Sequence, residues 1–143
     1  MTTLYLGADH AGWKLKEALK PALQRMDVVV RDLSPTFNAG DDYPKVAMAA
    51  AKSVARNKAL RGVLFCGSGV GMAIAANRMK GVRAMDAASI PQVKLARAHD
   101  DVNVLTVGAL SVSPSEALRL INAFLAAPAS KAARHRRRVK QLG

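Results

Sequence analysis

A glycine-rich segment near the middle of the chain combines a possible base with a possible anion site. It reads Cys66-Gly67-Ser68-Gly69-Val70-Gly71 and ends an apolar run. Glycines between a strand and a helix let several backbone N–H groups approach an anion closely, and the helix dipole strengthens the attraction. The same field lowers the pKa of a nearby thiol toward neutrality. We therefore expect a Cys66 thiolate that can act as a base.

A base beside anion-binding amides suits one class of reaction. Isomerising an aldose to a ketose requires a base that takes the C2 proton and donors that stabilise the resulting enediolate. A purely structural interpretation stays open, in which the glycines only permit tight strand-to-helix packing. A lone cysteine also usually just fills space in a core.

Dinucleotide binding is a second functional interpretation of the same segment. Asp86 follows about twenty residues later, where an acid would bind a ribose hydroxyl. The glycine spacing argues against this, because the fingerprint has Gly or Ala five residues after its first Gly, and Met72 stands there. The segment also follows the third expected strand rather than the first.

Short β-branched or apolar runs alternate with segments of helical period, which predicts a parallel sheet covered by helices. The expected strands are 3–6, 28–32, 62–66, 82–85 and 104–107. Ligands bind beyond the carboxyl ends of such strands. That rule selects Asp9 and His10, the glycine-rich segment, and Asp86.

Capping signals mark the expected helices. A first helix at 11–26 carries an apolar stripe, and its polar residues should face water. A second begins after Asp41 and Asp42, with Pro44 in its first turn, and runs to about 56. Ser113-Pro114-Ser115-Glu116 is a capping box. A basic helix at about 129–141 follows. The prediction is one α/β domain over 1–143: a doubly wound, Rossmann-like sandwich with a five-stranded parallel sheet and a C-terminal basic helix.

Composition narrows the function classes. The chain has 143 residues, 50% of them hydrophobic, which suits one core. No apolar run approaches the roughly 20 residues of a membrane span, and no signal-like start is seen, so a cytoplasmic protein without membrane contact is expected. Half of the net charge of +12 lies in the last fifteen residues, as a solvated basic face or tail. Aromatic residues make up only 4%, which disfavours nucleic acid as a partner.

No cofactor and no metal are expected. The three histidines, at positions 10, 99 and 135, and the one cysteine lack the close spacing of metal ligands. Proton transfer through an enediolate requires no metal.

Short sequence blocks, each weak alone, follow one another along nearly the whole chain. They are Gly7-Ala8-Asp9-His10-Ala11-Gly12, Asp42-Tyr43-Pro44, Cys66-Gly67-Ser68-Gly69-Val70-Gly71, Ala75-Ala76-Asn77, Gly81-Val82-Arg83-Ala84, Arg97-Ala98-His99, Asn103-Val104, and Arg134-His135 with Arg138. The ordered set resembles the ribose-5-phosphate isomerase B and galactose-6-phosphate isomerase family. The resemblance implies a sugar-phosphate isomerase of carbohydrate metabolism that interconverts ribose 5-phosphate and ribulose 5-phosphate, or a related sugar, through an enediolate.

The resemblance also implies a role for each matching residue. The catalytic residues would be Cys66 as the base, Ser68 beside the reacting carbons and His99 in ring opening. Asp9 would hold sugar hydroxyls, and the substrate phosphate would be held by His10, Arg134 and Arg138. Amides of Gly67, Gly69, Val70 and Gly71 would bind the anion, with Asp100 also in the site. Family members are homodimers, often paired into tetramers, in which the partner's His99 region completes each site.

Two positions depart from the family pattern. Asp100 stands where most pentose-phosphate isomerases of the family have Asn, and a carboxylate beside an enediolate is repulsive unless protonated, paired or turned away. Leu110 stands where an arginine commonly contributes to the phosphate site. An altered preference, for a hexose 6-phosphate or an unphosphorylated sugar, is therefore an alternative. A non-catalytic sugar-phosphate binding protein is another.

Overall fold

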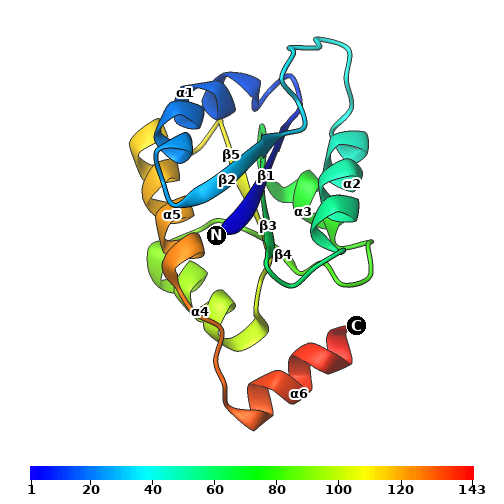
Figure 1. Ribbon diagram of the computed structural model, residues 1–143. Helices are drawn as coiled ribbons and strands as arrows, with labels where there is room; N and C mark the ends of the chain where they lie inside the picture. Colours follow the sequence, from blue (N-terminus) through cyan, green and yellow to red (C-terminus); the bar gives the residue numbers. More distant parts are fainter.

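Five parallel strands form a single sheet whose carboxyl ends meet at one edge (Figure 1). The computed structural model describes residues 1–143. The sheet order is β2-β1-β3-β5-β4, and all neighbouring strands are parallel. The strands are β1 (Thr2–Ala8), β2 (Val28–Asp32), β3 (Leu60–Cys66), β4 (Ala84–Asp86) and β5 (Val104–Gly108). The helices are α1 (Trp13–Gln24), α2 (Tyr43–Val54), α3 (Val70–Ala76), α4 (Ile90–Asp100), α5 (Pro114–Ala126) and α6 (Ala133–Leu142).

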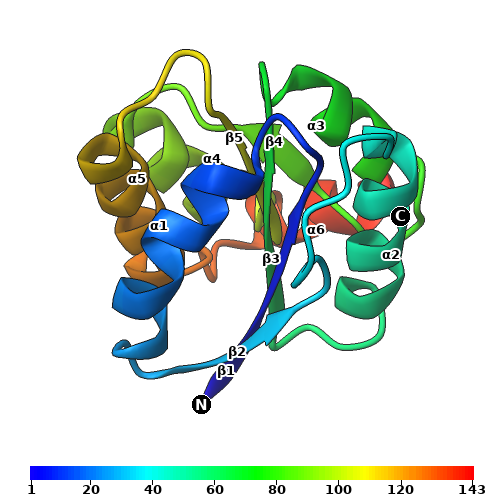
Figure 2. The same cartoon turned by 90° about the horizontal axis from the view of Figure 1, so that it is seen from above.

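Helices cover both faces of the sheet, which confirms the predicted doubly wound sandwich. Figure 2 shows α1, α4 and α5 on one face and α2 and α3 on the other. Each face has its own apolar core. Leu19, Ile121 and Phe124 belong to the first, and Val54 and Met72 to the second. Burying each such side chain contributes about 1.5–3 kcal/mol, so the two cores hold the strand ends in fixed relative positions.

Strand burial follows position in the sheet. All of β5, and β3 from Gly62 onward, is buried, because helices cover these inner strands on both faces. The edge strand β2 alternates between half-buried and exposed residues. Cys66, the predicted base, therefore lies at the carboxyl end of β3, in the most buried part of the sheet.

Helix starts follow the predicted signals. At the start of α5 the Ser113 hydroxyl accepts the N–H of Glu116, and the Glu116 carboxylate accepts the N–H of Ser113, which confirms the capping box. Pro44 lies in the first turn of α2, as expected. Asp42 precedes that helix but its side chain caps no N–H.

The fourth strand is shorter and later than the predicted 82–85. Val82 donates its N–H to the carbonyl of Met79, which closes a turn. Arg83 donates its N–H to the side-chain Oδ1 of Asn103 at 2.8 Å. The pairing with β5 starts with Ala84 opposite Val104, so β4 begins only there.

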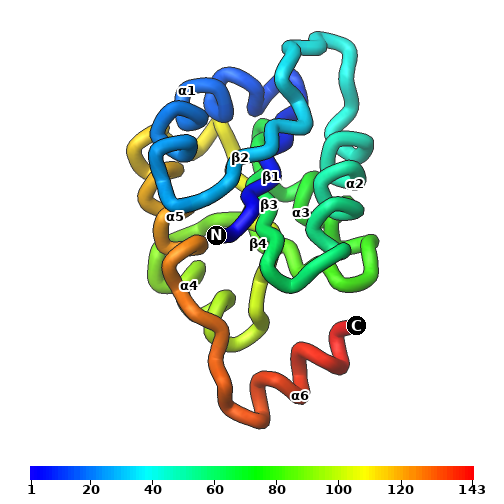
Figure 3. Tube along the Cα trace, viewed as in Figure 1, coloured from blue at the N-terminus to red at the C-terminus, as the bar shows by residue number.

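The first helix is shorter than predicted, and the basic helix begins later than predicted. The predicted 11–26 helix begins at Trp13, because Asp9 Oδ1 accepts the N–H groups of Ala11 and Gly12 and closes a turn ahead of it. The basic helix, predicted at about 129–141, begins at Ala133. Ser130 donates its N–H to the carbonyl of Ala98, which ties the preceding segment to α4. Figure 3 traces this segment from α5 past α4 to α6.

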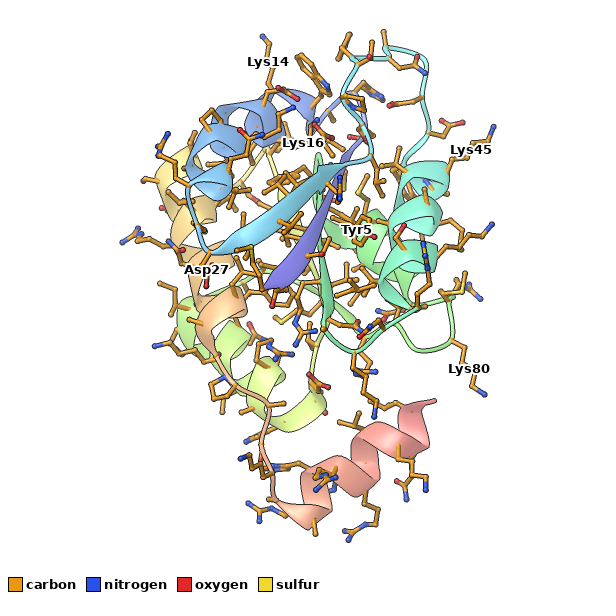
Figure 4. All side chains as sticks on the ribbon, in the orientation of Figure 1. Tyr5, Lys14, Lys16, Asp27, Lys45 and Lys80 are labelled. Carbon is orange, nitrogen blue, oxygen red and sulfur yellow. The ribbon has the colours of Figure 1, made fainter.

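One polar residue of α1 does not face water as expected. Lys16 is fully buried, and its ammonium donates to Glu17, to Asp32 and to the carbonyl of Ser34 at 2.6–2.8 Å. Three acceptors compensate the buried charge. Figure 4 shows Lys16 beside the end of β2. The ammonium thus holds the segment that follows β2 against α1, close to the turn that contains Asp9.

No helix in the structure is both long and apolar enough to cross a membrane.

Candidate active site

Cys66 ends β3 and faces the glycine-rich loop. The residue is only 4% exposed, and its Sγ accepts the N–H of Gly69 at 3.1 Å. The exposed Ser68 hydroxyl accepts the N–H of Val70, at the start of α3. The N–H groups of Gly67 and Gly71 make no hydrogen bond within the chain. The loop therefore presents free amide donors next to the thiol, as the sequence predicts.

Two of the loop glycines are required by their surroundings. Gly69 has φ +83°, a left-handed conformation that suits glycine, and a Cβ on it would collide with the carboxylate of Asp86. A Cβ on Gly71 would stand 2.6 Å from the ring of Tyr43. Tyr43 therefore lies against the start of α3 and closes one side of the loop.

The expected lowering of the Cys66 pKa is wrong for this chain. Burial raises the pKa of the thiol, and the charge of Asp9 raises it further. Amides of Gly69, Met72 and Ser68 act in the opposite direction but do not outweigh burial. The loop field exists as predicted, but the desolvation that comes with an enclosed strand end is larger.

Asp9 and His10 follow β1 and lie, like Cys66, at the carboxyl ends of the strands. Asp9 is buried, and its Oδ1 accepts the N–H groups of Ala11 and Gly12 at 3.0 Å, which closes the turn ahead of α1. The exposed His10 imidazole pairs through Nδ1 with Asp41 at 3.0 Å. That hydrogen bond raises the pKa of His10, which favours the imidazolium that a phosphate would attract.

Leu110 lies over the same loop. The loop after β5 is fixed by two hydrogen bonds, from Ala109 N–H to the carbonyl of Cys66 and from Leu110 N–H to that of Gly67. The Leu110 side chain is 87% exposed. An apolar group therefore projects into solvent at the position where the family arginine is expected.

A second group of predicted site residues lies elsewhere. His99 and Asp100 end α4, and Arg134 and Arg138 lie on α6, all four exposed. The His99 ring stacks on the buried His135 ring, with centroids 4.4 Å apart and 27° between the planes. Burial lowers the pKa of His135, and the charges of His99, Arg134 and Arg138 lower it further.

The two groups of residues lie at opposite ends of the strands, the first at the carboxyl ends and the second at the amino ends. Asp100 closes the helix that leads into β5, whose first residue Val104 pairs with Gly62. Strands rise about 3.3 Å per residue, so Gly62 lies about 13 Å from Cys66. Figure 1 shows α6 beyond the edge opposite the β-strand tips. One chain therefore does not bring His99, Asp100, Arg134 and Arg138 to Cys66.

A basic cavity of about 810 Å³ separates α6 from the body of the chain. His99 and His135 line it, together with Arg136 and Arg137. Arg134 and Arg138 do not line it, so they lie on a different side of α6. No cluster of three or more His, Cys, Asp or Glu side chains is arranged to hold a metal ion.

Sequence reasoning missed several neighbours of the site. They are Asp41, Tyr43, Asp86 as a loop contact, Thr106 and His135. Tyr43 and His135 both belong to sequence blocks that carry the family resemblance, so both carried a signal, although no role was expected for either. Thr106 carried none, because a threonine in a strand is ordinary.

Comparisons with known proteins identify the family of the chain. The family described as Ribose/Galactose Isomerase matches residues 4–142. Ribose-5-phosphate isomerase B of Mycobacterium tuberculosis is 37% identical over 137 residues, which cover 95% of this chain and 85% of that protein. A probable ribose-5-phosphate isomerase B of Mycoplasma genitalium is 39% identical over 142 residues, covering 97% and 92%.

Solved structures share the whole fold. The crystal structure of ribose-5-phosphate isomerase B from Mycoplasma genitalium with bound ribulose-5-phosphate has a TM-score of 0.91 at 37% identity, covering 99% of this chain and 93% of that one. The enzyme from Thermotoga maritima gives 0.92 at 33% identity, covering 99% and 97%. The family match spans nearly every residue, and both site-bearing edges lie within it. The chain therefore belongs to the ribose/galactose isomerase family.

Proposed function

We propose that this chain interconverts ribose 5-phosphate and ribulose 5-phosphate through an enediolate, with Cys66 as the base. The observation that carries the proposal is the thiol of Cys66 at the carboxyl edge of the sheet, facing a loop with free amides. A relative of the same fold was solved with bound ribulose-5-phosphate. The sugar phosphate is thus a fitting substrate for this site.

The loop performs two tasks in this reaction. Cys66 takes the proton from C2 as a thiolate and returns it to C1. The N–H groups of Gly67 and Gly71, with the Ser68 hydroxyl, donate to the oxygens on which negative charge develops. Donors that are already in place stabilise the enediolate without reorganisation, and each such donor typically contributes about 10²–10³ in kcat.

Substrate binding uses the neighbouring strand ends. The free Oδ2 of Asp9 accepts a sugar hydroxyl, while its Oδ1 holds the turn. His10, whose pKa is raised by the hydrogen bond to Asp41, attracts the phosphate. Arg134 and Arg138 are four residues apart on α6, share one side of the helix, and present two guanidinium groups to the same phosphate.

The second group of residues comes from another copy of the chain. His99, Asp100, Arg134 and Arg138 lie at the edge opposite Cys66 in their own chain, so a homodimer with shared sites would supply them. A tetramer is built by pairing two such dimers. The His99 imidazole then opens the sugar ring: it accepts the proton of the C1 hydroxyl, the bond between C1 and the ring oxygen breaks to give the aldehyde, and the proton is passed to the ring oxygen.

The first experiment measures ketose formation from ribose 5-phosphate by the purified protein, without added metal. Cys66→Ala should lose turnover by at least about 10³-fold, since it removes the base. Ser53→Ala, a hydroxyl deletion on α2 away from the site, is the matched control and should keep wild-type rates. Turnover that survives in Cys66→Ala would overturn the assignment of the base.

A second candidate is favoured by Leu110 and Asp100. The exposed Leu110 offers no charge to a phosphate, and the Asp100 carboxylate has no hydrogen-bond partner in the chain. A hexose 6-phosphate or an unphosphorylated sugar would then be preferred. A substrate panel decides this: kcat/KM higher for such a sugar than for ribose 5-phosphate supports the second candidate. Binding of the sugar phosphates without turnover of any panel member would indicate a binding protein instead.

A further inference from the structure

Asp86 has no role in the proposed reaction, yet it touches the loop that performs it. The residue ends β4 at the carboxyl edge of the sheet, and its Oδ1 fills the space where a Cβ of Gly69 would stand. Sequence alone offered it as a ribose-binding acid of a dinucleotide site. In the structure it faces the inner side of the anion loop instead.

Thr106 connects Asp86 to that loop. The Thr106 hydroxyl oxygen is fully buried with its residue and lies 2.7 Å from the carbonyl oxygen of Gly69 and 3.2 Å from Asp86 Oδ1. The amide of the same Gly69 donates to Cys66 Sγ. A chain of contacts therefore runs from Asp86 through Thr106 and Gly69 to the proposed base.

The number of protons available along these contacts decides which group donates to which. A threonine hydroxyl has one proton, and a carbonyl can only accept. The 2.7 Å distance to Gly69 is that of a well-formed O–H···O bond, so the Thr106 proton goes to the carbonyl. The Thr106 oxygen can then only accept from Asp86. That contact is a hydrogen bond only if Asp86 itself carries a proton.

We propose that Asp86 is a positioning residue that works in its neutral, protonated form: it donates to Thr106, which holds the Gly69 carbonyl and so fixes the anion loop beside Cys66. The inference rests on the proposed function, because the loop it positions is the proposed enediolate site. A neutral acid here supplies a donor without placing a negative charge beside a thiolate and an enediolate.

The surroundings of Asp86 support the neutral form. The elements against it, β5 and α3, contain no ionisable side chain, and Asp86 forms no ion pair. The contacts that run from Asp86 through Thr106 and Gly69 end at the Cys66 thiol, which is the ionisable group they reach. Burial raises the pKa of Asp86. A Thr106 hydroxyl that donated to the carboxylate would lower this pKa, but the single Thr106 proton is given to the Gly69 carbonyl.

The test uses the only cysteine of the chain as a probe. Alkylation of Cys66 by iodoacetamide is measured against pH in wild type, Asp86→Asn, Asp86→Leu, Thr106→Ser and Thr106→Val, with Asp27→Asn as an exposed control. Circular dichroism and thermal melts establish that each variant is folded. This readout needs no turnover, so it stands even if the proposed isomerase activity fails.

Asp86→Asn keeps a donor for Thr106, and Thr106→Ser keeps the hydroxyl. Both should therefore leave the alkylation midpoint of Cys66 where wild type has it. Asp86→Leu and Thr106→Val should release Gly69 and move the midpoint to higher pH. In ribose 5-phosphate turnover, Asp86→Leu should lower kcat about tenfold or more with KM nearly constant, and Asp86→Asn should recover most of that loss.

Two results would overturn the proposal. If Asp86→Asn moves the Cys66 midpoint to lower pH, a charge has been removed and Asp86 is ionised in the native protein. If Asp86→Leu and Thr106→Val match wild type in both midpoint and kcat, the contact chain positions nothing.

Discussion

The imidazole of His99 stacks on the imidazole of His135, with ring centroids 4.4 Å apart. The first ring is exposed on α4 and the second is buried on α6, so the stack joins the two helices that carry the second group of site residues. Under the proposed function the His99 ring opens the sugar, which requires that the ring be held in one orientation. His135 supplies that support, and its buried Nδ1 has no hydrogen-bond partner in the chain.

The lowered pKa of His135 predicts a pH-dependent stability. The folded protein favours the neutral His135 ring. The full free energy of unfolding is therefore present above pH 6.5. It decreases as the pH falls below 6.5, because the unfolded chain takes up the proton more readily than the folded one. Melting temperatures at pH 7.5 and pH 5.5 should differ more for wild type than for His135→Phe, which keeps a ring but cannot titrate. Equal differences in the two proteins would contradict the assignment. Gln141→Ala, on the exposed end of α6, is the control.

The raised pKa of Cys66 predicts a rate that climbs with pH. A base that is mostly protonated near neutrality gains thiolate about tenfold per pH unit until the pH reaches its pKa. Wild-type kcat for ribose 5-phosphate should therefore rise from pH 7 through pH 8.5. A rate that is flat over this range would mean that substrate or a second copy of the chain lowers the pKa of the thiol again.

The pair of His10 and Asp41 predicts a change in substrate affinity. Asp41→Asn removes the negative charge that strengthens the hydrogen bond to His10 and raises the pKa of its imidazole, so the imidazole is less often charged. KM for ribose 5-phosphate should rise about threefold to tenfold while kcat changes little. Asp42→Asn is a matched control, because the Asp42 side chain caps nothing. An unchanged KM in Asp41→Asn would remove His10 from the phosphate site.

Local sequence signals predict the fold and the Cys66 loop well. Glycines after an apolar run specify a tight strand-to-helix turn, and the capping box at Ser113 specifies a helix start, because both depend on residues within a few positions. The strand-end rule then collects Asp9, His10 and Cys66 at one edge without knowledge of the packing.

Tertiary effects account for what the sequence could not predict. The pKa of Cys66 depends on the balance between loop amides and desolvation, and desolvation follows from helices that are distant in the chain. Asp41 meets His10 across 31 positions, and Thr106 meets Gly69 across 37. Lys16 is buried although charged helix residues usually face water, because its ammonium donates to Asp32 and to the carbonyl of Ser34.

The buried ammonium of Lys16 predicts a large stability loss on truncation. Lys16→Ala leaves part of a buried acceptor set without its donor, and breaking such an arrangement costs roughly 3–5 kcal/mol. The loss should lie near the lower end, because Lys20 also pairs with Asp32. Urea unfolding measures the free energy of unfolding directly. Lys14→Ala, two residues earlier on α1 and exposed, should cost less than about 0.5 kcal/mol. A similar loss in both variants would show that the buried network contributes little.

The proposed sharing of sites between two copies of the chain predicts that two inactive variants restore each other. Cys66→Ala lacks the base but keeps His99, and His99→Ala keeps the base. Unfolded together and refolded as a mixture, half of the dimers are mixed, and each mixed dimer has one site with both residues intact. The mixture should therefore recover about a quarter of wild-type activity, as random pairing of a symmetric dimer requires. Cys66→Ala mixed with Cys66→Ser is the control and should recover nothing. If the first mixture also stays inactive while size-exclusion chromatography shows mixed dimers, Cys66 and His99 do not act on the same substrate.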